Sequence, residues 1–275
     1  MHGIGNDYIY VNCLDGELDN PDSISEKMSK RHFSVGADGL VMICRSDIAD
    51  AKMRMFNADG SEGKMCGNAI RCVGKYLYDN GITDKTELDI ETLSGVKHLT
   101  LNIVGGKVDT VRVDMGIAIT KPSLVPVIYS GEIMLDEPIT VLGKDYRITA
   151  VSMGNPHAVC FVDEVDGIDL ERIGPSFENL LIFPDRVNTE FVRVIDNKTL
   201  QMRVWERGSG ETFACGTGSC ATVAAAVLNG ICKAGDEVTV KLIGGDLQIV
   251  CTEDMRVYMT GKAEKVYEGV YDYED

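Results

Sequence analysis

Two stretches of the chain repeat one another at a constant spacing of 149 positions. Cys66-Gly67 falls on Cys215-Gly216, and the same offset places Phe56 on Trp205. Three further blocks obey it, namely Glu62 and Glu211, Asn80-Gly81-Ile82 and Asn229-Gly230-Ile231, and Ile4-Gly5-Asn6 and Met153-Gly154-Asn155. One offset that holds over blocks so far apart indicates an ancient duplication, so we expect two similar halves.

The length of 275 residues suits two domains of ordinary size, each with its own core. We expect an N-terminal domain over 1–116 that carries Cys66 and a second domain over 117–261 that carries Cys215. The remaining segment, 262–275, is expected to return to the first domain. Two halves that face each other would bring the two thiols to one cleft.

Charge and cysteine usage exclude several classes of function. A net charge of −16 argues against nucleic acid and against an anionic membrane surface. No apolar run is long enough to span a bilayer, and the first residues lack the pattern of a signal peptide. The nine cysteines form no Cys-x-x-Cys pair, which favours a reduced compartment. We therefore expect a cytoplasmic protein.

Most of the chain has the pattern of short strands bounded by Gly, Asn or Asp. The expected strands are 8–11, 39–43, 51–56, 99–103 and 108–115, then 158–162, 190–195, 199–205, 237–242, 247–251 and 255–259. Gly105-Gly106 predicts a hairpin. A helix is expected over Ser23–Arg31, with Ser23 as its N-cap and Glu26 three residues later, as in a capping box.

Two further helices are expected directly after the repeated cysteines, over 67–79 and 216–228. Each ends in Asn-Gly, which is typical of a left-handed helix C-terminus. Residues 219–228 carry no charge on any face, so this helix must be buried all round, whereas the first copy carries Arg71 and Lys75. We therefore expect an α+β fold of two pseudo-symmetric domains, each a curved, mostly antiparallel sheet or barrel wrapped around a central helix.

Cys66 and Cys215 each stand where a helix begins. The unpaired N–H groups and the helix dipole there favour negative charge, so a thiol ionises more easily and a carboxylate can bind. A lone cysteine is usually a small buried hydrophobe, and we interpret Cys13, Cys44, Cys72, Cys160, Cys220, Cys232 and Cys251 in that way. The spacings do not fit a zinc site, and the four His are scattered, so no metal is expected.

Polar, Gly-rich loops lead into both thiols, over 57–62 and 206–211. Either loop alone is best read as a plain turn, but as a pair they indicate walls of a substrate site. Arg207 is a candidate fork for a carboxylate. The candidate polar contacts are Asn6, Asn57, Asn68, Asn155 and Asn188, although a single Asn in a loop is more often part of a turn.

Seven segments of this chain closely resemble the diaminopimelate epimerase family, in order and nearly from end to end. They are residues 2–8, 56–62, 66–68, 152–157, 186–188, 206–212 and 215–221. The resemblance implies a homodimeric enzyme that converts L,L-diaminopimelate to the meso form, in the synthesis of lysine and of a peptidoglycan precursor. It implies no cofactor, and pyridoxal phosphate in particular is not expected.

The resemblance also implies roles for individual residues. Cys66 and Cys215 would be the acid/base pair, with His157 and Glu206 supporting catalysis. The implied substrate contacts are Asn6, Asn57, Asn155, Asn188, Glu206 and Arg207, together with the backbone of Gly67, Asn68, Gly216 and Thr217. Three features depart from the family pattern. Gly39 stands where many members have Gln, and Ala69 replaces a frequent Gly. Members also commonly have several more residues before the His-Gly pair, so either the true start lies upstream or one edge strand is short.

The hypothesis from the sequence is a two-base inversion, in which one thiolate removes the α-proton and the other thiol delivers a proton to the opposite face. The 149-residue offset relates Tyr8 to His157, Asn57 to Glu206, Gly39 to Asn188 and Asn68 to Thr217, so the two halves supply matching positions with mostly different chemistry. One alternative is a related two-thiol racemase that acts on histidine or proline. Phenazine-biosynthesis-type isomerases generally lack the thiol pair. A non-catalytic thiol redox or zinc-binding protein is an alternative of another class, for which a metal assay is expected to find no stoichiometric zinc. A purely structural role leaves both polar loops unexplained.

Overall fold

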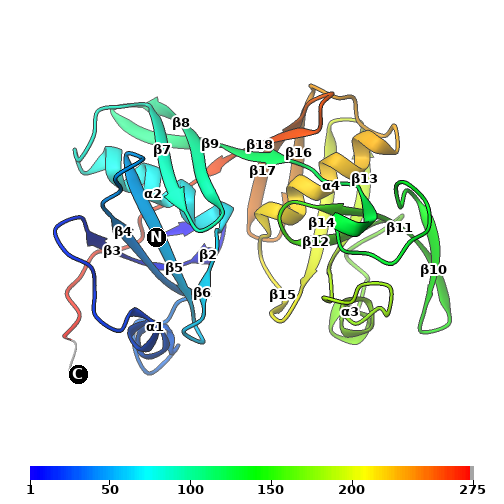
Figure 1. Cartoon of the computed structure of the whole chain (residues 1–275), viewed down its shortest axis with the longest axis horizontal. Helices are drawn as coiled ribbons and strands as arrows, with labels where there is room; N and C mark the ends of the chain where they lie inside the picture. Colours follow the sequence, from blue (N-terminus) through cyan, green and yellow to red (C-terminus); the bar gives the residue numbers. More distant parts are fainter. Residues whose placement is uncertain (273–275) are drawn as a thin grey trace. The chain divides into compact units, whose positions relative to one another are not determined.

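The computed structural model describes residues 1–272. The chain divides into two compact units, one formed by Met1–Val113 with the segment that starts at Gly261, and one formed by Asp114–Thr260. In each unit a mixed sheet is accompanied by one long helix and one shorter helix (Figure 1).

The first unit contains two helices and nine strands, β1 to β9. They are β1 (His2–Gly3), β2 (Asn6–Asp7), β3 (Ile9–Cys13), α1 (Pro21–Ser29), β4 (Gly39–Cys44), β5 (Ala51–Asn57), β6 (Glu62–Gly63), α2 (Gly67–Asp79), β7 (Glu87–Thr92), β8 (Gly95–Val104) and β9 (Lys107–Ile117). The strand order is β3-β4-β5-β7-β8-β9, with β6 paired to β5. The pairs β3–β4 and β5–β7 are parallel, and the other pairs within this sheet are antiparallel.

The second unit repeats this plan. Its elements are η1 (Pro122–Leu124), β10 (Glu137–Val141), β11 (Lys144–Ser152), β12 (Pro156–Phe161), α3 (Leu170–Glu178), β13 (Asn188–Asp196), β14 (Thr199–Glu206), β15 (Gly210–Glu211), α4 (Gly216–Leu228), β16 (Glu237–Leu242), β17 (Gly245–Cys251) and β18 (Arg256–Lys262). The strand order is β10-β11-β12-β13-β14-β16-β17-β18, with β15 paired to β14. Here β12–β13 and β14–β16 are the parallel pairs.

The strand registers of the two units obey the 149-residue offset. Leu40 pairs with Phe56 in the first unit, and Thr189 pairs with Trp205 in the second. The same shift converts the bounds of α1 into those of α3, and the bounds of α2 into those of α4. The duplication therefore extends to hydrogen-bond register and to a pair of helices that the sequence repeat did not reveal.

Helix α4 lies against five strands of its unit, β11, β12, β13, β16 and β17 (Figure 1). Its buried residues include Ser219, Thr222 and a run of alanines, as expected for a helix with no charged face. Small side chains let the strands approach closely on several sides. Both helix ends also match the prediction, because Gly81 and Gly230 adopt the positive φ angles of 68° and 70° that follow a helix C-terminus.

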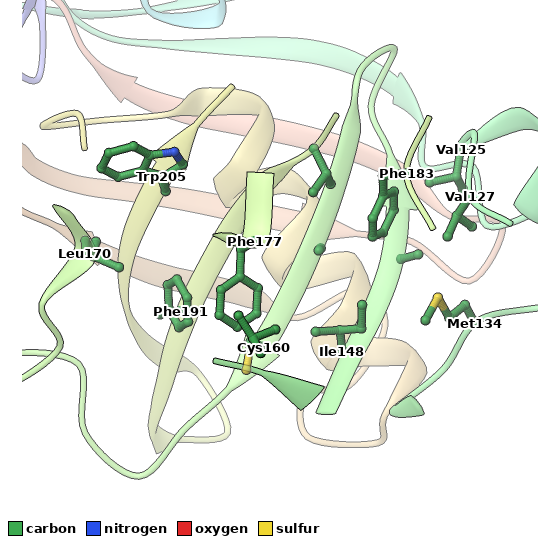
Figure 2. Packing of buried hydrophobic residues seen from close by; sticks show 14 of the residues in the cluster. Val125, Val127, Met134, Ile148, Cys160, Leu170, Phe177, Phe183, Phe191 and Trp205 are labelled. Atoms are coloured by element: carbon green, nitrogen blue, oxygen red, sulfur yellow. The ribbon is translucent and has the colours of Figure 1, made fainter. Parts of the chain in front are cut away.

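An aromatic cluster joins α3 to the sheet of the second unit (Figure 2). The ring of Phe177 meets the rings of Tyr146 and Phe191 edge to face, each at a centroid distance of 5.0 Å. Trp205, at the end of β14, donates from its indole Nε1 to Glu178 of α3 at 2.8 Å. This packing fixes the end of the strand that leads into the polar loop 206–211.

Some elements differ from the prediction. The first helix runs over Pro21–Ser29, and its N-cap is Asn20, so Ser23 is not the N-cap. Pro at the first helical position has the φ angle that a helix needs, which places the start two residues earlier. Strands β7, β10 and β11 and helix α3 were not predicted. The hairpin at Gly105 and Gly106 is confirmed, with positive φ at both residues.

Within 1–272, no helix combines the length and the apolar character that crossing a membrane requires. The same residues contain no group of three or more His, Cys, Asp or Glu side chains placed to hold a metal ion. All nine cysteines are free thiols.

Candidate active site

In the first unit, Cys66 is the N-cap of α2 and is half-buried. Its Sγ donates to Oδ1 of Asn6 at 3.4 Å, and the side-chain amide of Asn68 donates to the same oxygen at 3.4 Å. The amide of Asn6 donates in turn to Asp38 at 2.7 Å, which keeps Oδ1 turned toward the thiol. The structure thus brings together Cys66 and two of the predicted asparagines.

Arg71 supports this half-site from inside the unit. Its side chain is 0% exposed, and the guanidinium donates to the carbonyl oxygen of Gly67 and to Oδ1 of Asn68, both at 3.0 Å. Arg71 therefore holds the first turn of α2 and the amide that faces Asn6. In the sequence, Arg71 indicates only that this helix is amphipathic, because the pattern alone does not show that a charged residue is buried.

Two other predicted positions of this unit lie in different surroundings. The side-chain amide of Asn57, at the end of β5, donates to Ser61 at 3.0 Å within its own turn. Gly39 has no room for a side chain, since a Cβ there would lie 2.1 Å from the backbone oxygen of Phe56. A Gln at this position would require a different backbone, which explains the departure from the family pattern.

In the second unit, Cys215 is the N-cap of α4 and is only 4% exposed. The backbone N–H of Gly218 donates to its Sγ at 3.3 Å, and the hydroxyl of Thr217 lies 3.5 Å from the same sulfur. This is the expected position at a helix N-terminus, where N–H groups without a partner in the helix are available to an anion.

The expectation that this thiol ionises easily is wrong for Cys215. Its pKa is raised well above the usual value by burial, and then by the negative charges of Glu206 and Glu190. The hydrogen bonds from Thr217 and Gly218 lower the pKa, but by less. Burial in a low-dielectric surrounding together with two carboxylates outweighs the helix terminus, so Cys215 is held as a protonated thiol.

His157 lies in β12 behind this thiol and is 0% exposed. Its Nδ1 is 2.7 Å from Oε1 of Glu190, and its Nε2 is 3.0 Å from Oδ1 of Asn155. The amide of Asn155 reaches Oγ1 of Thr217 at 3.4 Å. Glu190 was not predicted as a site residue, because in the sequence it lies inside an ordinary strand.

Three predicted site residues lie at the end of β14, namely Glu206, which is its last residue, Arg207, which follows it, and Asn188. The side-chain amide of Asn188 donates to the carbonyl oxygen of Pro156 at 2.8 Å, and its Oδ1 accepts the backbone N–H of Arg207 at 3.0 Å. The Arg207 guanidinium donates to the backbone oxygen of Asp185 at 2.7 Å.

Glu206 is half-buried and accepts a hydrogen bond from Thr212 at 2.5 Å. Burial of its carboxyl group raises its pKa, and hydrogen bonds from Thr212 and Cys215 and the charge of His157 oppose that shift. The second unit therefore gathers a thiol, an imidazole and two carboxyl groups in one buried cluster. Such a cluster can hold and donate a proton.

Comparison with known proteins identifies close relatives. The family model described as "Diaminopimelate epimerase" matches residues 1–121 and 149–266. A protein of Acetivibrio thermocellus named diaminopimelate epimerase is 56% identical over 273 residues, covering 99% of this chain and 97% of the relative. A protein of Agathobacter rectalis with the same name is 52% identical over 280 residues, covering 99% of this chain and 98% of the relative.

Solved structures show the same fold at much lower identity. A phenazine biosynthesis protein of Bacillus anthracis superimposes with a TM-score of 0.69 at 19% identity, covering 95% of this chain and 92% of that protein. A hydroxyproline epimerase from Agrobacterium vitis gives a TM-score of 0.68 at 15% identity, covering 95% of this chain and 86% of that protein. The α+β fold is therefore shared with a phenazine biosynthesis protein and with a hydroxyproline epimerase.

Proposed function

This chain belongs to the diaminopimelate epimerase family, and on that premise we propose that it converts L,L-diaminopimelate to meso-diaminopimelate with Cys66 and Cys215 as the acid/base pair. The observation that supports this most is the equivalence of the two cysteines. Each is the N-cap of the long helix in its own unit, at positions related by the 149-residue offset. An inversion at carbon needs one proton-transfer group on each face, and a duplicated thiol supplies that pair.

The reaction is a balanced proton exchange at the α-carbon. A thiolate accepts the α-proton, and the electron pair of the broken C–H bond moves toward the substrate carboxylate. The opposite thiol then gives its proton to the other face of the carbon, so one C–H bond breaks and one forms. The raised pKa of Cys215 suits it to be the donor when Cys66 is the base, and the reverse reaction exchanges these roles.

The helix N-termini have a second role in this proposal. The backbone N–H groups of Gly67, Asn68, Gly216 and Thr217 would bind the carboxylate on which negative charge develops. The asparagines and Arg207 would hold the distal end of the substrate in one orientation.

Exchange of the α-proton with deuterated solvent tests the proposal. Cys66→Ala and Cys215→Ala should each lower the epimerisation rate by about 10²- to 10⁴-fold, which is the range of a general acid or base. Cys160→Ala, which removes a buried thiol from the aromatic cluster, is the matched control and should keep most of the activity. Near wild-type epimerisation by either site variant would contradict the two-base mechanism.

The same assay separates the proposed substrate from its rivals. L,L-diaminopimelate, histidine and proline are offered in parallel, and only the first should lose its α-proton at an appreciable rate. Faster exchange with histidine or proline would assign the chain to another two-thiol racemase.

We also propose that the enzyme works as a homodimer in the cytoplasm and binds neither nucleic acid nor membrane. The family resemblance supports the dimer, and the net charge of −16 opposes binding to polyanions. Light scattering at micromolar concentration should give twice the mass of the 30.0 kDa chain, and a mass of one chain would contradict the dimer.

A further inference from the structure

Glu190 is the one member of the buried cluster that was not predicted from the sequence and has no role in the proposed reaction. It lies in β13, and its side chain is 0% exposed, as is that of His157. Oε1 lies 2.7 Å from Nδ1 of His157, whereas Oε2 has no hydrogen-bond partner in the described part of the chain. A buried carboxyl group needs a hydrogen-bond partner, and the imidazole of His157 is the side chain that it contacts.

The contacts of His157 define a direction for the hydrogen bonds beyond it. Nδ1 lies 2.7 Å from the carboxyl group of Glu190 and Nε2 lies 3.0 Å from Oδ1 of Asn155, so the ring is held at both nitrogens. Asn155 accepts at Oδ1 and therefore donates from Nδ2 to Thr217. With that oxygen acting as acceptor, the hydroxyl hydrogen of Thr217 is available for the sulfur of Cys215 at 3.5 Å.

Gly218 provides the space that this arrangement needs. A Cβ at position 218 would lie 2.6 Å from Oε1 of Glu190 and 3.2 Å from Sγ of Cys215. In the first unit, the 149-residue offset places Val41 at the position of Glu190 and Ala69 at the position of Gly218. The first unit of this chain therefore has neither the glutamate nor the glycine.

We propose that Glu190 is a positioning residue that holds the ring of His157 at Nδ1 and, through Asn155 and Thr217, orients the Thr217 hydroxyl toward the sulfur of Cys215. The inference rests on the proposed function, because these hydrogen bonds lead to a cysteine that transfers the proton in the proposed reaction. The hydroxyl of Thr217 stabilises the thiolate of Cys215 at the stage when that thiolate forms.

Removing the carboxylate removes the reason for this direction. Glu190→Met removes the group that holds the ring of His157 at Nδ1. The ring can then turn, and the Asn155 amide can turn its oxygen toward Thr217. The hydroxyl would donate to that oxygen and no longer to the sulfur, so a thiolate at Cys215 would lose one charge-assisted hydrogen bond.

The experiment is a double-mutant cycle built from Glu190→Met and Thr217→Val, the first and last side chains of the hydrogen-bonded series that leads to Cys215. The first readout is the rate at which iodoacetamide alkylates Cys215 at pH 9, followed by peptide mass spectrometry in a Cys66→Ser background. The second readout is kcat for epimerisation in the otherwise wild-type chain. Asp79→Asn, which removes a carboxylate paired with Lys75 at the far end of α2, is the control.

Thr217→Val should slow alkylation and lower kcat about tenfold, as expected for a hydrogen bond to a charged group. In Glu190→Met, loss of that hydrogen bond is opposed by removal of a negative charge that raises the pKa of Cys215. The ratio of the Glu190→Met rate to its parent rate should therefore be about tenfold higher in the Thr217→Val background than in the wild-type background, because only the charge effect is left there. Equal ratios in both backgrounds would overturn the proposal, since Glu190 would then act only on packing or by its charge. Asp79→Asn should leave both rates within about twofold.

A cycle built on Glu190→Gln carries the same test if Glu190→Met does not fold. The amide keeps a hydrogen-bonding group beside Nδ1, so the difference between the ratios in the two backgrounds should be smaller and of the same sign. Alkylation needs no substrate, so it reports on Glu190 even if the wild-type chain does not act on diaminopimelate. Failure of that reaction would contradict the proposed function alone.

Discussion

Gly174 in α3 is the position where the addition of one methyl group should be most informative. A Cβ there would lie 2.2 Å from Cδ2 and 2.4 Å from Cε3 of Trp205. The ring cannot simply move aside, because it is 92% buried (8% exposed) and its Nε1 donates to Glu178 of the same helix. In the first unit, the offset places Ser25 at this position and the smaller ring of Phe56 opposite it.

Opposing effects decide whether Gly174→Ala raises or lowers the free energy of unfolding. Ala in place of Gly inside a helix usually stabilises by about 0.5–1 kcal/mol. Overpacking of a rigid site costs about 1–3 kcal/mol, and loss of a buried hydrogen bond to a carboxylate costs about 1.5–3 kcal/mol. The expected result is a decrease of about 2–5 kcal/mol in the free energy of unfolding, against the helix propensity.

The assay is urea unfolding followed by tryptophan fluorescence, since Trp205 is the only tryptophan of the chain and reports on the second unit. The control is Gly167→Ala, because a Cβ at Gly167 would meet no atom within 4 Å. This control should stay within about 0.5 kcal/mol of wild type. If Gly174→Ala were as stable as the control, the packing of Trp205 against α3 would not be as described.

Three further perturbations have defined outcomes. Burial raises the pKa of Glu206 above its usual value of 4.5, so the folded state binds the proton of this carboxyl group more tightly than the unfolded chain does. The free energy of unfolding therefore falls as the pH rises from the unfolded pKa of Glu206 through its folded pKa. Glu206→Gln should therefore unfold at a higher temperature than wild type at pH 7 and at about the same temperature below pH 4, while epimerisation falls. Gly39→Ala should lower the free energy of unfolding by about 1–3 kcal/mol, because the new Cβ meets the backbone oxygen of Phe56, and a chemical denaturation curve measures this. Arg71→Met removes the guanidinium donor from the carbonyl of Gly67 and from the amide oxygen of Asn68, so it should cost about 2–4 kcal/mol and slow alkylation of Cys66, as peptide mass spectrometry would show. Unchanged stability of Arg71→Met would mean that the guanidinium does not hold the first turn of α2.

The long helices were the most predictable elements of the fold. Residues 219–228 lack any charge, and Asn-Gly closes both helices, so their bounds agree with the prediction at 67–79 and 216–228. Helix α3 was not predicted, because Gly174 and Pro175 inside it are typical of a turn. Only the contact of Gly174 with Trp205 explains why a glycine stands in a helix.

The sequence by itself determined the duplication and the family and predicted the two candidate thiols, because a constant offset and local motifs can be recognised without knowing any distance. The tertiary structure alone decided the protonation chemistry around Cys215. Helix position predicted a thiol that ionises easily, whereas burial beside Glu206 and Glu190 raises its pKa. Glu190 reaches His157 because β12 and β13 are parallel neighbours, and sequence spacing does not contain that pairing. Electrostatic energies depend on distance and burial, so they are settled by strand register and packing.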